Sequence, residues 1–309
     1  MTKRKERKVS PNIVLFGLLA VVGLGAPAHG GTYTKLVSFG DSLSDVGNVF
    51  LATGGAEPDP LQYFEGRYST GPTWVEYLAG KLGVATPTPG LLGGANHAFG
   101  GAESGRSGTS TLGTPNLGTQ VGMYLATSPT IGADTLLTVW AGANDFLYGG
   151  QIDPTVSVAN VAAAITTLAG AGGSQFLVAN LPMLGSIPAT SGHPQAIRDG
   201  LNYLAHTFNA LLKNEVGALE QNLGVTIHFM DIDRYFQAMV ANPPAFGLTA
   251  DPLFHPDGVH PTTQLHQLIA DLAYNAVVPE PASIALLGIA GVALTAGAGV
   301  RHRRAKRAA

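Results

Sequence analysis

Ser42 stands in a motif whose residue types could perform nucleophilic acyl transfer. It lies in Gly40-Asp41-Ser42-Leu43, directly after an apolar run, so a tight turn there could present its hydroxyl. A serine is a weak nucleophile until an adjacent base removes its proton, and acyl transfer also needs donors for the developing oxyanion. Helix capping is the competing interpretation, because many strand-to-helix turns use Gly, Asp and Ser.

Asp257 and His260 could supply that base. They lie three residues apart in Asp257-Gly258-Val259-His260-Pro261, so the carboxylate could accept a hydrogen bond from the imidazole. Such a bond fixes the tautomer and stabilises the imidazolium that forms when the histidine takes the serine proton. In the structural alternative, Pro261 begins a helix and the polar residues only cap it.

Two further motifs could stabilise an oxyanion. In Gly142-Ala143-Asn144-Asp145, the side-chain N–H of Asn144 could donate to a reacting oxygen just beyond a strand. In the stretch 96–102, a glycine would let a backbone N–H approach a substrate closely. Each of these motifs could equally be an ordinary turn or a glycine-rich loop.

Strands alternate with helices along the chain. Short β-branched and apolar runs predict strands at 33–39, 135–140, 175–179 and 225–229. Helices are predicted at 73–82, 156–169, 196–222, 232–241 and 262–276. The segment 84–118 is rich in Gly, Pro, Ser and Thr and is predicted to be mostly loop. The alternation predicts a parallel sheet covered on both faces, a three-layer α/β/α sandwich with its ligand site at the carboxyl ends of the strands.

Taken in order, the serine, glycine, asparagine and Asp-x-x-His motifs resemble the SGNH/GDSL hydrolase family. The resemblance implies a flavodoxin-like α/β fold of the SGNH-hydrolase type and an ester hydrolase activity. It assigns the nucleophile to Ser42, the general base to His260 and the residue that orients this base to Asp257. It assigns the oxyanion hole to the backbone N–H groups of Ser42 and Gly101 and the side-chain amide of Asn144.

The resemblance covers about residues 33–276 and is closest to the family's lipase, esterase and haemolysin-related branch. Supporting motifs are Asn180-Leu181-Pro182, Phe208-Asn209 and the segments 66–74 and 242–249. The chain differs from many relatives at Thr70, where they carry asparagine, and before the motif aspartate, where Phe254-His255-Pro256 intervenes. These differences leave the shape of the acyl pocket open.

Composition excludes several other kinds of chemistry. The chain has no cysteine, which excludes a disulfide, a thiolate metal site and a cysteine nucleophile. No histidine has the carboxylate spacing of a metal site and no nucleotide-binding glycine motif occurs in a suitable context, so we expect no metal and no cofactor. Residues 29–280 hold 7 Lys and Arg against 19 Asp and Glu, a net charge near −12. Such a surface repels phosphate backbones, so we expect no nucleic-acid partner.

The start of the chain is typical of an export signal. Residues 1–28 combine a basic beginning, an apolar run over 13–24 and an Ala-x-Ala cleavage site at 26–28, as in a secretory signal peptide. The apolar run is shorter than the ~20 residues of a usual membrane span. An uncleaved N-terminal anchor is the alternative.

The end of the chain is similar to the PEP-CTERM sorting signal of Gram-negative bacteria. Residues 278–309 combine a Pro-Glu-Pro motif at 279–281, an apolar stretch over 284–300 and a basic tail over 301–307. The resemblance implies that a membrane enzyme cuts near the Pro-Glu-Pro motif. A permanent anchor is the alternative, because a short apolar helix followed by positive charges is retained in a membrane.

These features together predict an exported serine esterase or lipase whose hydrolase domain spans 29–277. We expect it in the cell envelope or outside the cell, after transient retention in the inner membrane through the C-terminal helix. The expected partners are the export machinery, a sorting enzyme and a small-molecule or lipid ester, with acetylated polysaccharide as a further candidate substrate. The alternative is a non-catalytic envelope or polysaccharide-associated protein that retains the fold.

Overall fold

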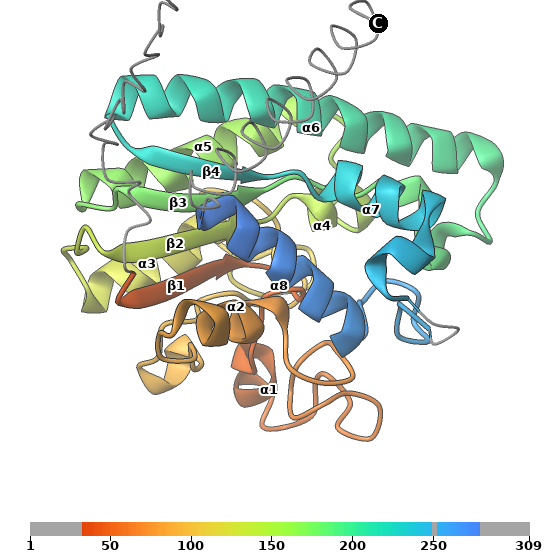
Figure 1. Ribbon diagram of the computed structural model, residues 1–309, viewed down its shortest axis with the longest axis horizontal. Coiled ribbons are helices and arrows are strands. Elements are labelled where there is room, and N and C mark those ends of the chain that lie inside the picture. Colours follow the sequence, from red (N-terminus) through yellow and green to blue (C-terminus); the bar gives the residue numbers. More distant parts are fainter. Residues whose placement is uncertain (1–32, 249–251, 279–309) are drawn as a thin grey trace, which may run out of the picture. The chain divides into compact units, whose positions relative to one another are not determined.

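The computed structural model describes residues 33–248 and 252–278, which lie in one unit with a hydrophobic core (Figure 1). The predicted signal peptide at 1–28 and all but the first residue of the predicted sorting segment at 278–309 lie outside the described residues. Both segments therefore stay predictions. Within the described ranges, no helix has the length and apolar character needed to cross a bilayer.

Four parallel strands form the central sheet in the order β1-β2-β3-β4. They are β1 (Lys35–Gly40), β2 (Thr135–Trp140), β3 (Gln175–Ala179) and β4 (Thr226–Met230). Every residue of β2 is buried, as expected for a β-branched and apolar strand inside a parallel sheet. The carboxyl ends of the strands meet at one edge of the sheet, where the serine and asparagine motifs begin.

Residues 95–99 extend the sheet beyond β1. The N–H of Ser38 donates to the Ala95 carbonyl at 3.0 Å, and the N–H of His97 donates to the Ser38 carbonyl at 2.7 Å. The segment therefore takes the place of a strand on the outer side of β1, which produces the flavodoxin-like order 2-1-3-4-5. Ligands bind such sheets where the strand order reverses, which here is the carboxyl end of β1 and β2.

Helices cover both faces of the sheet (Figure 1). On one face, α2 (Trp74–Leu82) packs against α8 (Thr263–Val277). On the other face, α5 (Pro154–Gly170) packs against α3 (Leu117–Thr127) and α6 (Gln195–Leu223). The fold is therefore the three-layer α/β/α sandwich that the sequence predicted.

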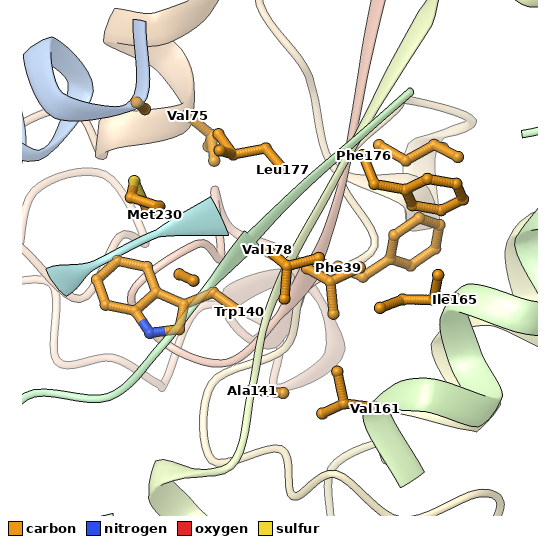
Figure 2. Close-up of a cluster of buried hydrophobic side chains, with 14 of the residues drawn as sticks. Phe39, Val75, Trp140, Ala141, Val161, Ile165, Phe176, Leu177, Val178 and Met230 are labelled. Atoms are coloured by element: carbon orange, nitrogen blue, oxygen red, sulfur yellow. The ribbon is translucent and has the colours of Figure 1, made fainter. Parts of the chain in front are cut away.

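The hydrophobic core lies between the sheet and these helices. Figure 2 shows Phe176 and Leu177, successive residues of β3, pointing to opposite sides of the strand. Phe176 points to the side of Ile165 in α5, and Leu177 points to the side of Val75 in α2. All four side chains are fully buried. Alternation along each strand thus lets the sheet bury apolar surface against both helical layers.

The observed boundaries agree closely with the predicted ones. β2, β3 and α7 (Ile232–Ala241) match the predictions residue for residue, and the other predicted elements differ by at most two residues at either end. The sequence did not predict α1 (Asn48–Ala52), α3 or α4 (Ala143–Leu147). The first and last of these are very short, and α3 contains Gly118 and Gly122, which have low helix propensity.

Short 3₁₀ helices occur in the loops. Within the described residues they span Gly90–Leu92, Leu184–Ser186, Pro188–Thr190 and Pro243–Phe246. The first of them lies in the segment 84–118, which is otherwise mostly loop, as predicted, until α3 begins. The second and third follow β3 and approach the carboxyl edge of the sheet.

Candidate active site

The turn after β1 presents Ser42 at the carboxyl edge of the sheet. Gly40 adopts a φ of +149°, and a Cβ there would lie 2.2 Å from the Trp140 carbonyl oxygen, so the turn requires glycine. The side chain of Gln120 in α3 accepts from the Gly40 N–H at 2.9 Å and donates to the Gly40 carbonyl at 2.8 Å. These contacts hold the end of β1, and Ser42 follows it with only 7% of its surface exposed.

The carboxylate of Asp45 is fully buried and accepts four backbone hydrogen bonds. Its Oδ1 accepts from the N–H groups of Gly47 at 2.8 Å and Asn48 at 2.6 Å. Its Oδ2 accepts from the N–H groups of Val49 at 3.2 Å and Gly100 at 2.9 Å. Burial raises the pKa of Asp45 to about 6, although these hydrogen bonds oppose the shift. The bond to Gly100 ties the glycine loop to the serine turn.

Two buried asparagines strengthen this connection. Asn48 Nδ2 donates to the carbonyl groups of Asn96 and Ala98, both at 2.9 Å. Asn96 Nδ2 in turn donates to the Ser44 carbonyl at 2.6 Å. The serine turn and the loop that carries Gly101 are therefore joined by a continuous set of buried hydrogen bonds, which limits their movement relative to one another.

Ser42, His260 and Asp257 form a continuous hydrogen-bonded chain. His260 Nε2 lies 2.8 Å from Ser42 Oγ, and His260 Nδ1 lies 2.6 Å from Asp257 Oδ2. Because a carboxylate can only accept, Nδ1 carries the proton and Nε2 accepts from the serine hydroxyl. The fold thus brings together, in hydrogen-bonding reach, three residues that the sequence places near opposite ends of the domain.

The carboxylate of Asp257 is held in its charged form. Its Oδ1 accepts from the backbone N–H groups of Val259 at 2.8 Å and His260 at 3.0 Å. Burial favours the neutral acid, but the hydrogen bond and charge of His260, together with the hydroxyl of Tyr63, outweigh burial and hold the pKa of Asp257 well below its usual range. A charged carboxylate in this position stabilises an imidazolium.

Tyr63 and His255 also contact Asp257, and the sequence motifs pointed to neither. The Tyr63 hydroxyl donates to Asp257 Oδ2, and the Tyr63 ring stacks on His255 with ring centroids 4.1 Å apart. The buried His255 donates from Nε2 to the Gln62 carbonyl at 3.2 Å, and its Nδ1 lies 3.2 Å from Asp257 Oδ2. Tyr63 precedes Asp257 by 194 positions, so only the folded chain reveals the pair.

Gly101 and Asn144, the other two predicted oxyanion donors, line one pocket together with Ser42 and His260. Gly101 has a φ of +76°, a conformation that favours glycine. Asn144 Nδ2 donates to the Ala102 carbonyl at 2.9 Å, which leaves its second N–H for another acceptor. Among the residues that the structure describes, no protein acceptor takes the backbone N–H of Ser42 or Gly101.

The matched family model identifies the class of enzyme. A model of GDSL-like lipases/acylhydrolases matches residues 36–273, a span that includes every predicted site residue. The chain belongs to this family. The protein is therefore a carboxylic ester hydrolase of the GDSL type, and the family prediction made from its motifs is confirmed.

Two curated relatives and one solved structure illustrate the range of similar proteins. This GDSL hydrolase is 31% identical over 249 residues to a phosphatidylcholine-sterol acyltransferase of Aeromonas hydrophila, a match that covers 77% of this chain and 69% of the relative. It is 29% identical over 217 residues to a thermolabile hemolysin of Vibrio parahaemolyticus, covering 69% of this chain but only 49% of the hemolysin. It is also similar to a crystal structure of an acetylxylan esterase from Geobacillus stearothermophilus, at 14% identity and a TM-score of 0.45, covering 80% and 95% of the two chains.

Two pockets of the GDSL hydrolase meet at Ser42, and Asn144 lines both. The first is narrow, with a volume of about 40 Å³, and is mainly apolar, with walls that include Trp140, Leu181, Leu184 and Phe254. The second is more open, with a volume of about 400 Å³, and is lined by Glu57, Tyr68, Tyr148 and His260. The two pockets offer separate places for the two halves of an ester.

The buried histidines of the GDSL hydrolase outside this site belong to its core. His97 stacks on Phe39 with ring centroids 5.7 Å apart, and burial, with the charge of Lys35, lowers the pKa of His97 to about 4. His266 Nδ1 accepts from the Trp74 N–H at 3.2 Å, and burial lowers the pKa of His266 to about 3. Within residues 33–248 and 252–278, no three side chains of the His, Asp or Glu type gather where they could hold a metal ion.

Proposed function

We propose that this GDSL hydrolase cleaves carboxylic esters through an acyl-enzyme on Ser42. The observation that carries the proposal is the pair of contacts at 2.8 and 2.6 Å that joins Ser42 to His260 and His260 to Asp257. Nucleophile, base and orienting carboxylate in this order are the recurring arrangement of serine hydrolases. The hydrolase domain also retains free donors beside the serine, which acyl transfer requires.

Acylation begins with a proton transfer from Ser42 to His260. Nε2 removes the hydroxyl proton as Oγ attacks the ester carbonyl carbon, and the charged Asp257 stabilises the imidazolium that results. The imidazolium then donates its proton to the alcohol oxygen while the C–O bond of the ester breaks. The alcohol leaves and the acyl group remains on Oγ.

Deacylation repeats these steps with water in place of the serine. His260 Nε2 removes a proton from a water molecule, whose oxygen attacks the acyl carbon. The bond between the acyl carbon and Ser42 Oγ breaks, the proton held by His260 returns to Oγ, and a carboxylic acid is released. The enzyme is left unchanged, so the cycle needs only ester and water.

In both steps, the carbonyl oxygen becomes an oxyanion that needs donors. The backbone N–H groups of Ser42 and Gly101 and the side-chain amide of Asn144 are the groups that we assign to it. Their support is positional, because all three residues line the pocket that also contains His260. Donors held in place before the reaction stabilise the transition state more than the ester, because the charge develops only during the attack.

We also propose that the enzyme is exported and reaches the cell envelope or the outside of the cell. The support is the sequence of its two ends, with the signal-type segment at 1–28 and the sorting-type segment at 278–309. The export machinery and a sorting enzyme would be its processing partners. Mass analysis of the protein from the envelope fraction of its native host should show that both segments are missing, and a full-length mass there would contradict the proposal.

The substrate proposed here is a small-molecule or lipid ester. A relative named as a phosphatidylcholine-sterol acyltransferase supports the lipid class. Acetylated polysaccharide is the alternative ester. The open pocket beside His260 can admit alcohols of either kind, so the alcohol half does not identify the substrate. The acyl half of the ester says more about the substrate class.

Hydrolysis of p-nitrophenyl acetate and butyrate tests the assignment of Ser42. Replacement of a serine nucleophile costs on the order of 10⁶ in turnover, so Ser42→Ala should reduce kcat to the detection limit. Ser107→Ala, which removes the hydroxyl of an exposed serine outside the site, is the matched control and should hydrolyse both esters at the wild-type rate. Hydrolysis by Ser42→Ala at a rate close to that of the wild type would refute the proposed function.

A further inference from the structure

The position of His260 distinguishes the acyl pocket from the alcohol pocket. During acylation, His260 Nε2 must donate its proton to the leaving oxygen, so the alcohol lies on the side of the serine where this nitrogen is exposed. His260 lines the open pocket with Tyr68 and Tyr148, but it is not part of the wall of the narrow pocket. The narrow pocket, which shares Ser42 and Asn144 with the open one, is therefore the place for the acyl chain.

The narrow pocket continues into a larger apolar pocket farther from Ser42. Pro182, Ile187, Phe236 and Phe254 belong to the walls of both. This larger apolar pocket, the outer pocket, has a volume of about 370 Å³. It adds apolar side chains of α7 and of the loop after it, namely Met239, Val240, Ala241 and Leu253. Together the two pockets form one apolar groove, which we call the acyl groove. It leads from the serine to Val240, which is 73% exposed.

Hydrogen bonds hold one wall of the acyl groove in place. Asn209 of α6 accepts from the Leu181 N–H at 2.9 Å and donates to the Leu181 carbonyl at 2.7 Å. Asn180 Nδ2 donates to Asp231 at 2.9 Å, which connects the end of β3 to the beginning of α7. A groove that is already formed in the free enzyme binds a chain without an ordering cost for its own walls.

The composition of the groove determines which acyl chain it can bind. Its walls near the serine are mainly apolar, with Asp41 and Asn144 as the polar residues beside Ser42. The polar residues of the outer pocket are the partly buried Asp233 and the exposed Ser186 and Gln237. An acetyl group would leave this apolar surface uncovered, whereas a longer unbranched chain would cover it. Each methylene group moved from water into an apolar site contributes about a fourfold increase in affinity.

We propose that the natural substrate carries an unbranched acyl chain of medium or greater length, which lies in the acyl groove from Ser42 to Val240. This inference rests on the acyl-enzyme mechanism proposed above, and it identifies the acyl half of the substrate. Phe236 and Phe254, whose ring centroids lie 6.4 Å apart, border the junction of the two pockets, which the chain must pass to reach Val240.

An acyl-length series on the full chain tests the proposal. We expect kcat/KM for p-nitrophenyl esters to rise by about fourfold per methylene from acetate to octanoate, because each added group enters the groove. In Val240→Asp, which places a charge at the outer end, the ratio of decanoate to acetate kcat/KM should fall about tenfold. Ile152→Asp adds the same charge to a residue that is 81% exposed and lines neither pocket, so its ratio should stay at the wild-type value.

A second variant tests the junction between the pockets. Phe254→Trp should narrow it, so the ratio of octanoate to acetate kcat/KM should fall while acetate hydrolysis in the same sample reports that the enzyme is folded. An acetate preference in the wild type would overturn the proposal that the acyl chain lies in the acyl groove. Unchanged ratios of long-chain to acetate kcat/KM in both Val240→Asp and Phe254→Trp would overturn it as well. If the wild type hydrolyses none of these esters, the proposed function itself fails, which is a different result from ester hydrolysis without chain-length selection.

Discussion

Ser42 and His260 are held in place by different kinds of contacts. We call the turn of Ser42 with the glycine loop the serine side, and the loop of Asp257 and His260 the histidine side. On the serine side, the buried Asp45 takes four backbone N–H groups and connects the turn to the glycine loop. On the histidine side, the Asp257 side chain is 27% exposed and the His260 side chain is 14% exposed. The histidine loop is positioned by its own backbone N–H groups and by the hydroxyl of Tyr63.

Because of this difference, we expect substitutions on the two sides to affect different quantities, stability on one side and reaction rate on the other. The polar contacts on the serine side are buried, so the hydrogen bonds that position Ser42 and the loop of Gly101 also hold the fold together. On the histidine side, the side chains of Asp257 and His260 are partly exposed, and single interactions near solvent contribute less to stability. Substitutions on the serine side should therefore lower the free energy of unfolding, whereas those on the histidine side should lower the rate.

The largest effect is expected from His260→Ala. Loss of the general base leaves Ser42 without an acceptor for its proton, and kcat should fall on the order of 10⁶-fold. The melting temperature should change by only a few degrees, because His260 lies in the more exposed part of the site. Ester hydrolysis and thermal unfolding of the same preparation measure both quantities. Retention of more than about a hundredth of the wild-type kcat would show that another base acts.

The same change of Asp to Asn on both sides tests the comparison directly. Asp257→Asn should reduce kcat by about 10⁴-fold, because the neutral amide no longer selects the productive tautomer of His260. Asp45→Asn should lower the free energy of unfolding by at least about 2 kcal/mol, because its amide N–H₂ would face backbone N–H groups that need an acceptor. Urea unfolding and steady-state kinetics on both variants give the result. Equal losses of stability would remove the distinction between the two sides.

Asn144→Ala should reduce kcat by about 10²–10³-fold with measurable activity left, because two oxyanion donors remain. Asn222→Ala, at an exposed position near the end of α6, is the matched control and should behave as the wild type. A loss of less than threefold in kcat for Asn144→Ala would mean that its amide does not contact the oxyanion.

Tyr63→Phe should reduce kcat roughly five- to tenfold, or about 1 to 1.4 kcal/mol, and leave KM unchanged. The reason is that Asp257 loses one of the donors that hold it and orient His260. Tyr77→Phe removes a phenol hydrogen bond to Thr263 at 2.7 Å and is a control for the loss of a hydroxyl alone. If both variants lose kcat equally, Tyr63 has no positioning role.

A further prediction concerns acid stability and His97, which lies in the loop that is joined to the serine turn. Burial lowers the pKa of His97 to about 4, from 6.5 in the unfolded chain. Between pH 6.5 and pH 4 the unfolded chain binds a proton that the folded protein does not, so the free energy of unfolding decreases as the pH falls. His97→Gln should reduce this slope by up to about 1.4 kcal/mol per pH unit. Urea unfolding across that range measures the slope, and His193→Gln, at an exposed position, should leave it unchanged.

Much of the fold could be predicted because its elements have strong local signals. β2 and β3 are short apolar runs between turn residues. α2 follows its N-cap Thr73, whose backbone N–H donates to the Glu76 side chain at 2.8 Å, as in a capping box. α3 lacked such signals, since its glycines lower helix propensity and its stability comes from tertiary packing. The side chain of Gln120 in this helix nevertheless holds the end of β1 before Ser42, a role that the sequence did not predict.

Site residues could be predicted where the chemistry requires a particular residue type. Residues that contribute only by lying close to the site in the folded chain could not be predicted. Ser42, Asn144 and the Asp257-x-x-His260 spacing carry chemical signals that a single sequence reveals. Tyr63 contacts Asp257 from 194 positions away, and any donor of suitable length could have filled that place. The acyl groove likewise combines segments after β3, in α7 and around Phe254, and no local pattern joins them.

The central claim is that His260 activates Ser42, and reaction with a fluorophosphonate tests it most directly, because this reagent reacts with a serine hydroxyl that a neighbouring base activates. Mass analysis of digested protein should find the label on the peptide that contains Ser42, with no label in Ser42→Ala and strongly reduced labelling in His260→Ala. Labelling of a different serine, or no labelling of the folded wild-type protein, would contradict the account.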